Sequence, residues 1–123
     1  SQTRFHAMSD GRRIAFRHRP GTGPALVFLP GYMSDMAGGK ATAVMDWAAA
    51  QGRECLMLDY SGCGQSDGTF AEGSLSRWRE EVLAVIGACC SGPVVLIGSS
   101  MGGWLMLLAA LARPEQAAAA GLQ

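Results

Sequence analysis

Residues 94–112 have the sequence VVLIGSSMGGWLMLLAALA, in which a short apolar run leads through glycines and serines into a longer apolar run. The first run is typical of a buried strand and the second of a buried helix. Between them, Gly98, Ser100 and Gly102 form the pattern G-x-S-x-G. In this context the pattern predicts a nucleophile elbow, a tight turn that exposes a serine hydroxyl and accepts only small neighbours. Ser100 is therefore the candidate nucleophile, with Gly98 and Gly102 as the elbow glycines.

The alternative is a glycine-rich turn whose serine merely caps the following helix. The strand and helix that flank the pattern favour the elbow. The helix behind Ser100 would also direct backbone N–H groups toward an oxyanion formed at the serine, which makes the Met101 N–H a candidate oxyanion donor.

Apolar runs along the rest of the chain predict the remaining elements. Residues 3–8 and 12–17 flank Asp10-Gly11 as an antiparallel hairpin would, and residues 25–29 and 55–58 are typical of buried strands. Helical spacing predicts helices over residues 39–51, stopped by Gly52, and from Leu75, capped by Ser74, to the Ser91-Gly92-Pro93 breaker. This order predicts one α/β domain over residues 1–123, a mostly parallel sheet with helices on both faces and an antiparallel N-terminal hairpin.

The alanine run at residues 117–120 leaves two interpretations open. It is either the tail of a helix or the start of a strand of small residues.

Two glycine-containing loops follow predicted strands, at the edge of a parallel sheet where ligands bind. In residues 30–35, the backbone N–H of Tyr32 is the candidate second oxyanion donor beside Met101. The alternative is a sharp turn in which the Tyr32 side chain is simply packed. In residues 59–68, we expect Asp59 or Ser66 to hold the loop through hydrogen bonds to nearby backbone.

Composition argues against several classes of function. Ten basic and ten acidic residues cancel, so no nucleic-acid partner is expected, and no apolar run reaches the ~20 residues of a membrane span. The four cysteines are not spaced as a zinc site would space them, and we interpret them as reduced thiols. Reduced thiols predict a cytoplasmic or otherwise reducing compartment, and the N-terminus has no signal-peptide pattern. A serine nucleophile with oxyanion donors needs no metal or organic cofactor, and none is expected.

Three motifs in this order resemble the α/β-hydrolase family: residues 30–35 (PGYMSD), 59–68 (DYSGCGQSDG) and 98–104 (GSSMGGW). More narrowly, they are similar to bacterial relatives of the mitochondrial palmitoyl-protein thioesterase that also cleaves acyl glucuronides. The resemblance implies an α/β-hydrolase fold and hydrolysis of small-molecule carboxylic esters or thioesters. It also implies that Ser100 is the nucleophile and that Met101 and Tyr32 form the oxyanion hole.

The rest of the catalytic triad is not found in this sequence. In such hydrolases the acid and the histidine follow the nucleophile, but no aspartate or histidine follows Ser100. His6 and His18 both belong to the predicted hairpin, which the resemblance places toward the far edge of the sheet. We therefore expect the N-terminal part of an enzyme, with little turnover on its own. An exposed sheet edge and helix face would favour a homo-oligomer or association with a C-terminal half.

Two other functions remain open at this point. One is a catalytically silent half-domain that acts only through self-association or complementation. The other is peptidase or lipase chemistry on the same fold, which would differ in pocket and lid.

Overall fold

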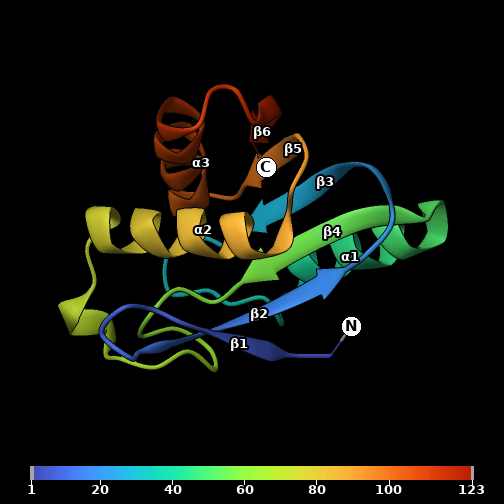
Figure 1. Cartoon of the computed structure of the whole chain (residues 1–123). Coiled ribbons are helices and arrows are strands. Elements are labelled where there is room, and N and C mark those ends of the chain that lie inside the picture. Colours follow the sequence, from blue (N-terminus) through green and yellow to red (C-terminus); the bar gives the residue numbers. More distant parts are fainter. Residues whose placement is uncertain (1, 123) are drawn as a thin grey trace.

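The computed structural model describes residues 2–122, and the described strands form a single six-stranded sheet in the order β1-β2-β4-β3-β5-β6 (Figure 1). The strands are β1 (Arg4–Ala7), β2 (Arg13–Arg19), β3 (Thr22–Leu29), β4 (Arg53–Leu58), β5 (Val94–Gly98) and β6 (Ala117–Leu122). β1 and β2 pair antiparallel, and β2 pairs antiparallel with β4. The pairs β4/β3, β3/β5 and β5/β6 are all parallel. The predicted mostly parallel sheet with an antiparallel N-terminal hairpin is therefore confirmed.

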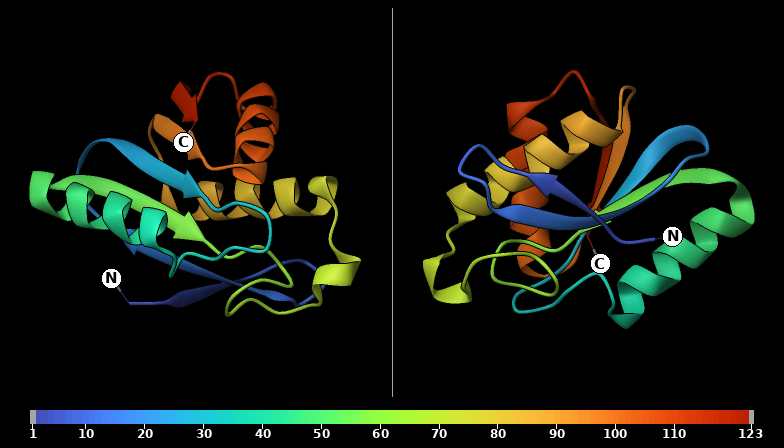
Figure 2. Two further views of the ribbon diagram at one scale, coloured as in Figure 1. Left: turned by 180° about the vertical axis from the view of Figure 1, so that it is seen from behind. Right: turned by 60° about the horizontal axis from the view of Figure 1, so that its bottom comes forward.

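Helices cover both faces of this sheet, as predicted. The helices are α1 (Gly39–Gln51), α2 (Leu75–Cys89) and α3 (Met101–Ala112), with a short 3-10 turn, η1, at Phe70–Glu72. Figure 2 shows α1 lying on one face while α2 and α3 lie on the other. Alternation along the buried strands divides the core accordingly, so that Val27 and Leu29 face α2 and α3 while Leu26 and Phe28 face α1.

Local signals account for the helix ends. α1 has the predicted bounds, because Gly52 takes the left-handed conformation (φ 67°) and donates to the carbonyls of Ala48 and Ala49. The side chain of Ser74 accepts a hydrogen bond from the Arg77 N–H and caps α2 as predicted.

Several strand bounds differ from the sequence expectations by a few residues: β2 ends at Arg19 rather than at residue 17, and β4 begins at Arg53 rather than at residue 55. β3 begins at Thr22 rather than at residue 25, with a shift of register against β4 between Thr22 and Leu26. The irregularity accommodates Pro24, which has no N–H for a regular ladder. The alanine run forms β6 beside β5, so it is a strand and not a helix tail. β5 is consequently an inner strand, and the sheet edge on this side is β6.

Candidate active site

Ser100 lies in a strained turn between β5 and α3. Its φ of 56° and ψ of −119° fall in a region that L-residues rarely adopt. Among the non-glycine residues of the described chain, only Met33 shares a positive φ. Such a conformation costs about 1–3 kcal/mol and persists only where the surrounding structure imposes it. The backbone therefore has the geometry that the elbow prediction requires.

Close packing around Gly98 and Gly102 imposes this geometry. A Cβ atom on Gly98 would overlap the Gly102 carbonyl and lie 2.6 Å from the Gly103 nitrogen. A Cβ atom on Gly102 would overlap the Leu29 carbonyl oxygen and lie 2.8 Å from the Pro30 carbonyl oxygen. Neither distance is compatible with a side chain, so both positions need glycine for the close approach of backbone to backbone.

The loop after β3 lies directly beside the nucleophile. A Cβ atom built on Gly31 would be 3.2 Å from the Ser100 Cβ, and the Ser99 N–H donates to the Leu29 carbonyl oxygen at 3.2 Å. Within residues 2–122, neither the Tyr32 N–H nor the Met101 N–H has an acceptor among the backbone and side-chain hydrogen bonds. An oxyanion hole needs free donors close to the nucleophile. Met101 follows Ser100 in the chain, and Tyr32 follows Gly31, which packs against Ser100.

The Tyr32 side chain has a separate, structural contact. Its ring meets Phe70 of η1 edge to face, with 5.1 Å between the centroids, and 61% of the residue is exposed. The side chain is therefore largely exposed and packs only against Phe70, and this contact leaves the backbone N–H of Tyr32 available.

The 59–68 loop holds the 30–36 loop in place. The Asp59 carboxylate accepts hydrogen bonds from the N–H groups of Met36 at 2.8 Å and Gln65 at 3.0 Å. The buried Tyr60 hydroxyl donates to the Pro30 carbonyl oxygen at 2.7 Å, and Ser66 Oγ donates to the Asp59 carbonyl oxygen at 2.6 Å. The expected structural roles of Asp59 and Ser66 are thus present, and Tyr60 is an anchor that the sequence analysis missed.

Burial dominates the electrostatics of this support. Desolvation raises the pKa of Asp59, although the two backbone N–H donors oppose the shift. The pKa of Tyr60 is also raised, mainly by burial, so its hydroxyl stays a donor to Pro30. The Tyr60 hydroxyl is therefore suited to fixing the loop rather than to exchanging protons at neutral pH.

Two hollows adjoin the elbow. One, of about 190 Å³, lies between the 30–35 loop, the start of α1 and Ser99, where Lys40 Nζ donates to Ser99 Oγ at 3.3 Å. The other, of about 270 Å³, is lined by Ser100, Gly103, Trp104 and Leu107. Sequence spacing gave no sign that Lys40 would reach Ser99, because the contact joins residues 59 positions apart. The second hollow offers apolar walls next to the serine.

Neither histidine of this chain lies near Ser100 in the sheet. His6 is on β1, and three strands, β2, β4 and β3, lie between β1 and β5 in the sheet. His18 lies toward the end of β2 and binds the Glu54 carboxylate through Nε2 at 2.7 Å. The expectation that neither acts as the base of Ser100 agrees with this placement.

Among residues 2–122, the helices are all too short or too polar to cross a bilayer.

Comparison with known proteins relates residues 26–122 to the family described as the alpha/beta hydrolase family. The human palmitoyl-protein thioesterase ABHD10, mitochondrial, is 46% identical over 110 residues, which are 89% of this chain and 36% of that protein. The structure of alpha/beta hydrolase domain-containing protein 10 from mouse has a TM-score of 0.95 and 41% identity, over 99% of this chain and 49% of that one. A putative hydrolase from Agrobacterium vitis has a TM-score of 0.87 and 36% identity, over 99% and 51%. The chain thus spans about a third of the length of the curated relatives it matches.

Proposed function

This chain belongs to the alpha/beta hydrolase family, and we propose that it carries the nucleophile and both oxyanion donors of a serine hydrolase that cleaves carboxylic esters or thioesters. One observation carries the proposal: Ser100 is held in a strained strand-to-helix turn, with Met101 next in the chain and Gly31, the neighbour of Tyr32, packed against it. Strain of this kind persists at sites of function.

The proposed reaction uses each of these groups. Ser100 Oγ attacks the carbonyl carbon of the substrate while its proton passes to a base, and the N–H groups of Tyr32 and Met101 bind the resulting oxyanion. Collapse of this intermediate expels an alkoxide or thiolate, which takes up the proton, and leaves an acyl-serine. Water then attacks the acyl-serine in the same way and releases the carboxylic acid.

The base and its acidic partner come, in this proposal, from outside the 123 residues. Both histidines of the chain lie away from Ser100 in the sheet, and no aspartate follows it in the sequence. A second copy of the chain, or the further length that the matched relatives possess, would supply them.

We propose a substrate with an apolar acyl group. The hollow lined by Trp104 and Leu107 adjoins Ser100 and offers apolar surface to such a chain. The relatives that the chain matches over 89% of its length are named palmitoyl-protein thioesterases, which supports a thioester as the reacting bond.

A cytoplasmic location stays a prediction based on the free cysteines. The names of the matched relatives say that those proteins are mitochondrial, so they do not support it.

The test of this function is intact-protein mass spectrometry after exposure to a fluorophosphonate. We expect slow formation of one adduct per chain, because an elbow and oxyanion hole retain about 10³–10⁴-fold catalysis over water without the other triad members. Ser100→Ala should form no adduct, whereas Ser99→Ala should still form it. An adduct that survives Ser100→Ala, or none in the wild-type chain after long exposure, would support the catalytically silent half-domain instead.

We also propose that the chain associates through the exposed face of α3. Trp104, Leu107 and Leu111 are 65%, 49% and 79% exposed and share one side of the helix by their spacing. Multi-angle light scattering at micromolar concentration should show an oligomer, and Leu107→Lys with Leu111→Lys should shift it toward the monomer because the charges oppose burial. A monodisperse wild-type monomer would contradict the proposal.

A further inference from the structure

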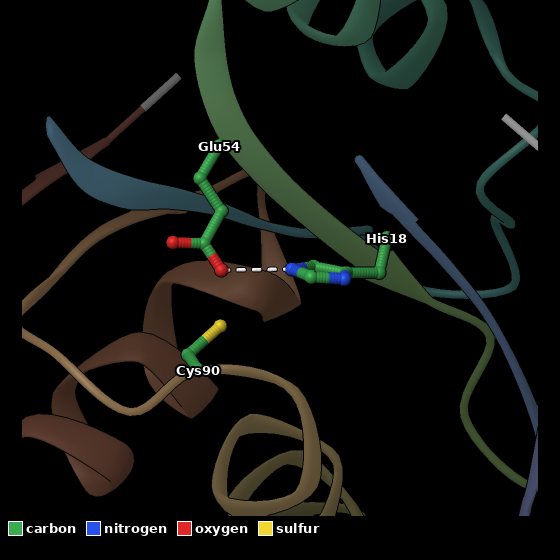
Figure 3. A group of neighbouring side chains, drawn as sticks. All are labelled: His18, Glu54 and Cys90. Carbon is green, nitrogen blue, oxygen red and sulfur yellow. Dashed lines mark hydrogen bonds and ion pairs between the residues drawn. The ribbon is translucent and has the colours of Figure 1, made fainter. Parts of the chain in front are cut away.

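Three potential metal ligands from separate elements come together at the other end of the sheet from Ser100. His18 lies on β2, Glu54 is the second residue of β4, and Cys90 directly follows α2 (Figure 3). Their ligating atoms all lie within 4.8 Å of one another. Glu54 stands at the amino end of β4, whereas Ser100 follows the carboxyl end of β5, and both strands run parallel to β3. The two sites are therefore separate.

Backbone pairing fixes the position of each ligand. His18 faces Leu56 across the antiparallel pair of β2 and β4, and Glu54 is two residues before Leu56, on the same face of the sheet. This places Glu54 Oε2 at 2.7 Å from His18 Nε2. The Cys90 N–H donates to the Ile86 carbonyl oxygen at 2.8 Å, and its own carbonyl accepts from Gln116 Nε2 at 3.2 Å. The backbone of each ligand is thus held by strand pairing or by hydrogen bonds.

The donor atoms suit a particular class of cation. An imidazole nitrogen, a carboxylate oxygen and a thiolate sulfur are ligands of Zn²⁺ and similar divalent transition metals, while the sulfur disfavours Ca²⁺ and Mg²⁺. In a tetrahedral site with bonds of about 2.0–2.3 Å, neighbouring ligand atoms lie roughly 3.3–3.8 Å apart. Small side-chain rotations of His18, Glu54 and Cys90 would reach this spacing.

Exposure and charge favour a bound cation as well. The side chains of His18 and Glu54 are 15% and 22% exposed, so an ion can enter from solvent and keep a water as fourth ligand. Cys90 is only 4% exposed. On binding, a divalent cation would displace the thiol proton to solvent, and the thiolate and carboxylate would together neutralise its charge.

We propose that His18 Nε2, the Glu54 carboxylate and Cys90 Sγ form a binding site for a divalent metal ion of the zinc class. The sequence did not predict this site, because His18 and Glu54 are 36 residues apart and so are Glu54 and Cys90. Ligands this far apart do not form a local metal-binding motif. Such an ion would link β2, β4 and the end of α2. It would stabilise the fold, since it binds the folded chain and not the dispersed ligands of the unfolded one.

Cobalt is the direct probe, because its absorption reports both sulfur ligation and geometry. Titration of the folded 123-residue chain with Co²⁺ should give a thiolate-to-metal charge-transfer band and the intense visible bands of a four-coordinate ion, saturating at one metal per chain. Zn²⁺ should displace the cobalt, and excess Zn²⁺ should raise the melting temperature. A folded chain with no charge-transfer band would overturn the proposal.

Matched variants test the individual ligands. Cys90→Ser should abolish the charge-transfer band and weaken Zn²⁺ binding more than the ~10–100-fold caused by loss of a group that only hydrogen-bonds to a ligand. Cys89→Ser changes the adjacent thiol and should keep both properties. His18→Gln should weaken binding similarly, whereas His6→Gln should not. If Cys90→Ser does not fold, as judged by circular dichroism, Glu54→Gln provides the comparison of binding strength, because it removes a ligand and keeps the thiolate. Retention of the band in Cys90→Ser, or unchanged binding in both His18→Gln and Glu54→Gln, would mean an ordinary ion pair beside a packed thiol.

Discussion

Gly102→Ala should lower the free energy of unfolding by about 3 kcal/mol or more, at the upper end of the range for overpacking a buried site. The new methyl group would overlap the Leu29 carbonyl oxygen and lie 2.8 Å from the Pro30 carbonyl oxygen. These are backbone atoms at the end of a central strand, so they cannot move away without shifting β3 and the loop after it. Small domains are stable by only about 5–15 kcal/mol, so this loss removes a large share of the stability and should lower the melting temperature markedly.

Gly87→Ala is the matched control, because Gly87 lies inside α2 and a Cβ atom there would meet nothing within 4 Å. This replacement should stabilise the chain by about 0.5–1 kcal/mol, since alanine loses less backbone entropy in a helix than glycine does. Urea denaturation followed by circular dichroism compares the two variants directly. If both alanines change the stability by the same amount, the close packing at the elbow is not as the structure describes it.

Helix ends and tight turns could be predicted from the sequence, because each depends on a few neighbouring residues. Gly52 ends α1 where expected because a left-handed position there favours glycine. Ser100 and its flanking glycines could be identified because a strand, a strained turn and a helix all follow within one short stretch. These features need no knowledge of how distant segments pair.

Long-range contacts could not be predicted in this way. Alanine favours helices, yet residues 117–120 form β6 because β5 offers them an unpaired edge, so tertiary context overrides propensity. The Tyr60 hydroxyl reaches Pro30 only because β4 and β3 are parallel neighbours whose ends coincide. The contact between His18 and Glu54 likewise depends on the register of β2 against β4.

Asp59→Ala should also have a large effect, because it removes the acceptor of two backbone donors at once. The Met36 N–H is buried and would lose its partner in the 59–68 loop, and the Gln65 N–H is partly buried. Each unsatisfied buried donor costs about 1–3 kcal/mol, so we expect a loss of roughly 2–4 kcal/mol in the free energy of unfolding. Because the bond to Met36 fixes the loop that carries Tyr32, labelling of Ser100 by a fluorophosphonate should slow as well.

Asp35→Ala is the control for this change, since the Asp35 carboxylate accepts a single exposed bond, from the Ala37 N–H. Asp35→Ala should lower the free energy of unfolding by less than about 1 kcal/mol.

The pH dependence of the Asp59→Ala effect gives a second, independent check. Burial raises the pKa of Asp59 above its ordinary value of 3.8, so the folded chain binds this proton more tightly than the unfolded chain does. The stabilising contribution of Asp59 is therefore fullest below that ordinary value and declines as the pH rises through the raised pKa. The difference in stability between the wild type and Asp59→Ala, measured by urea denaturation, should be larger near about pH 4 than near about pH 8. A difference that instead grows with pH would show that the two N–H donors outweigh burial and lower the pKa of this carboxyl group.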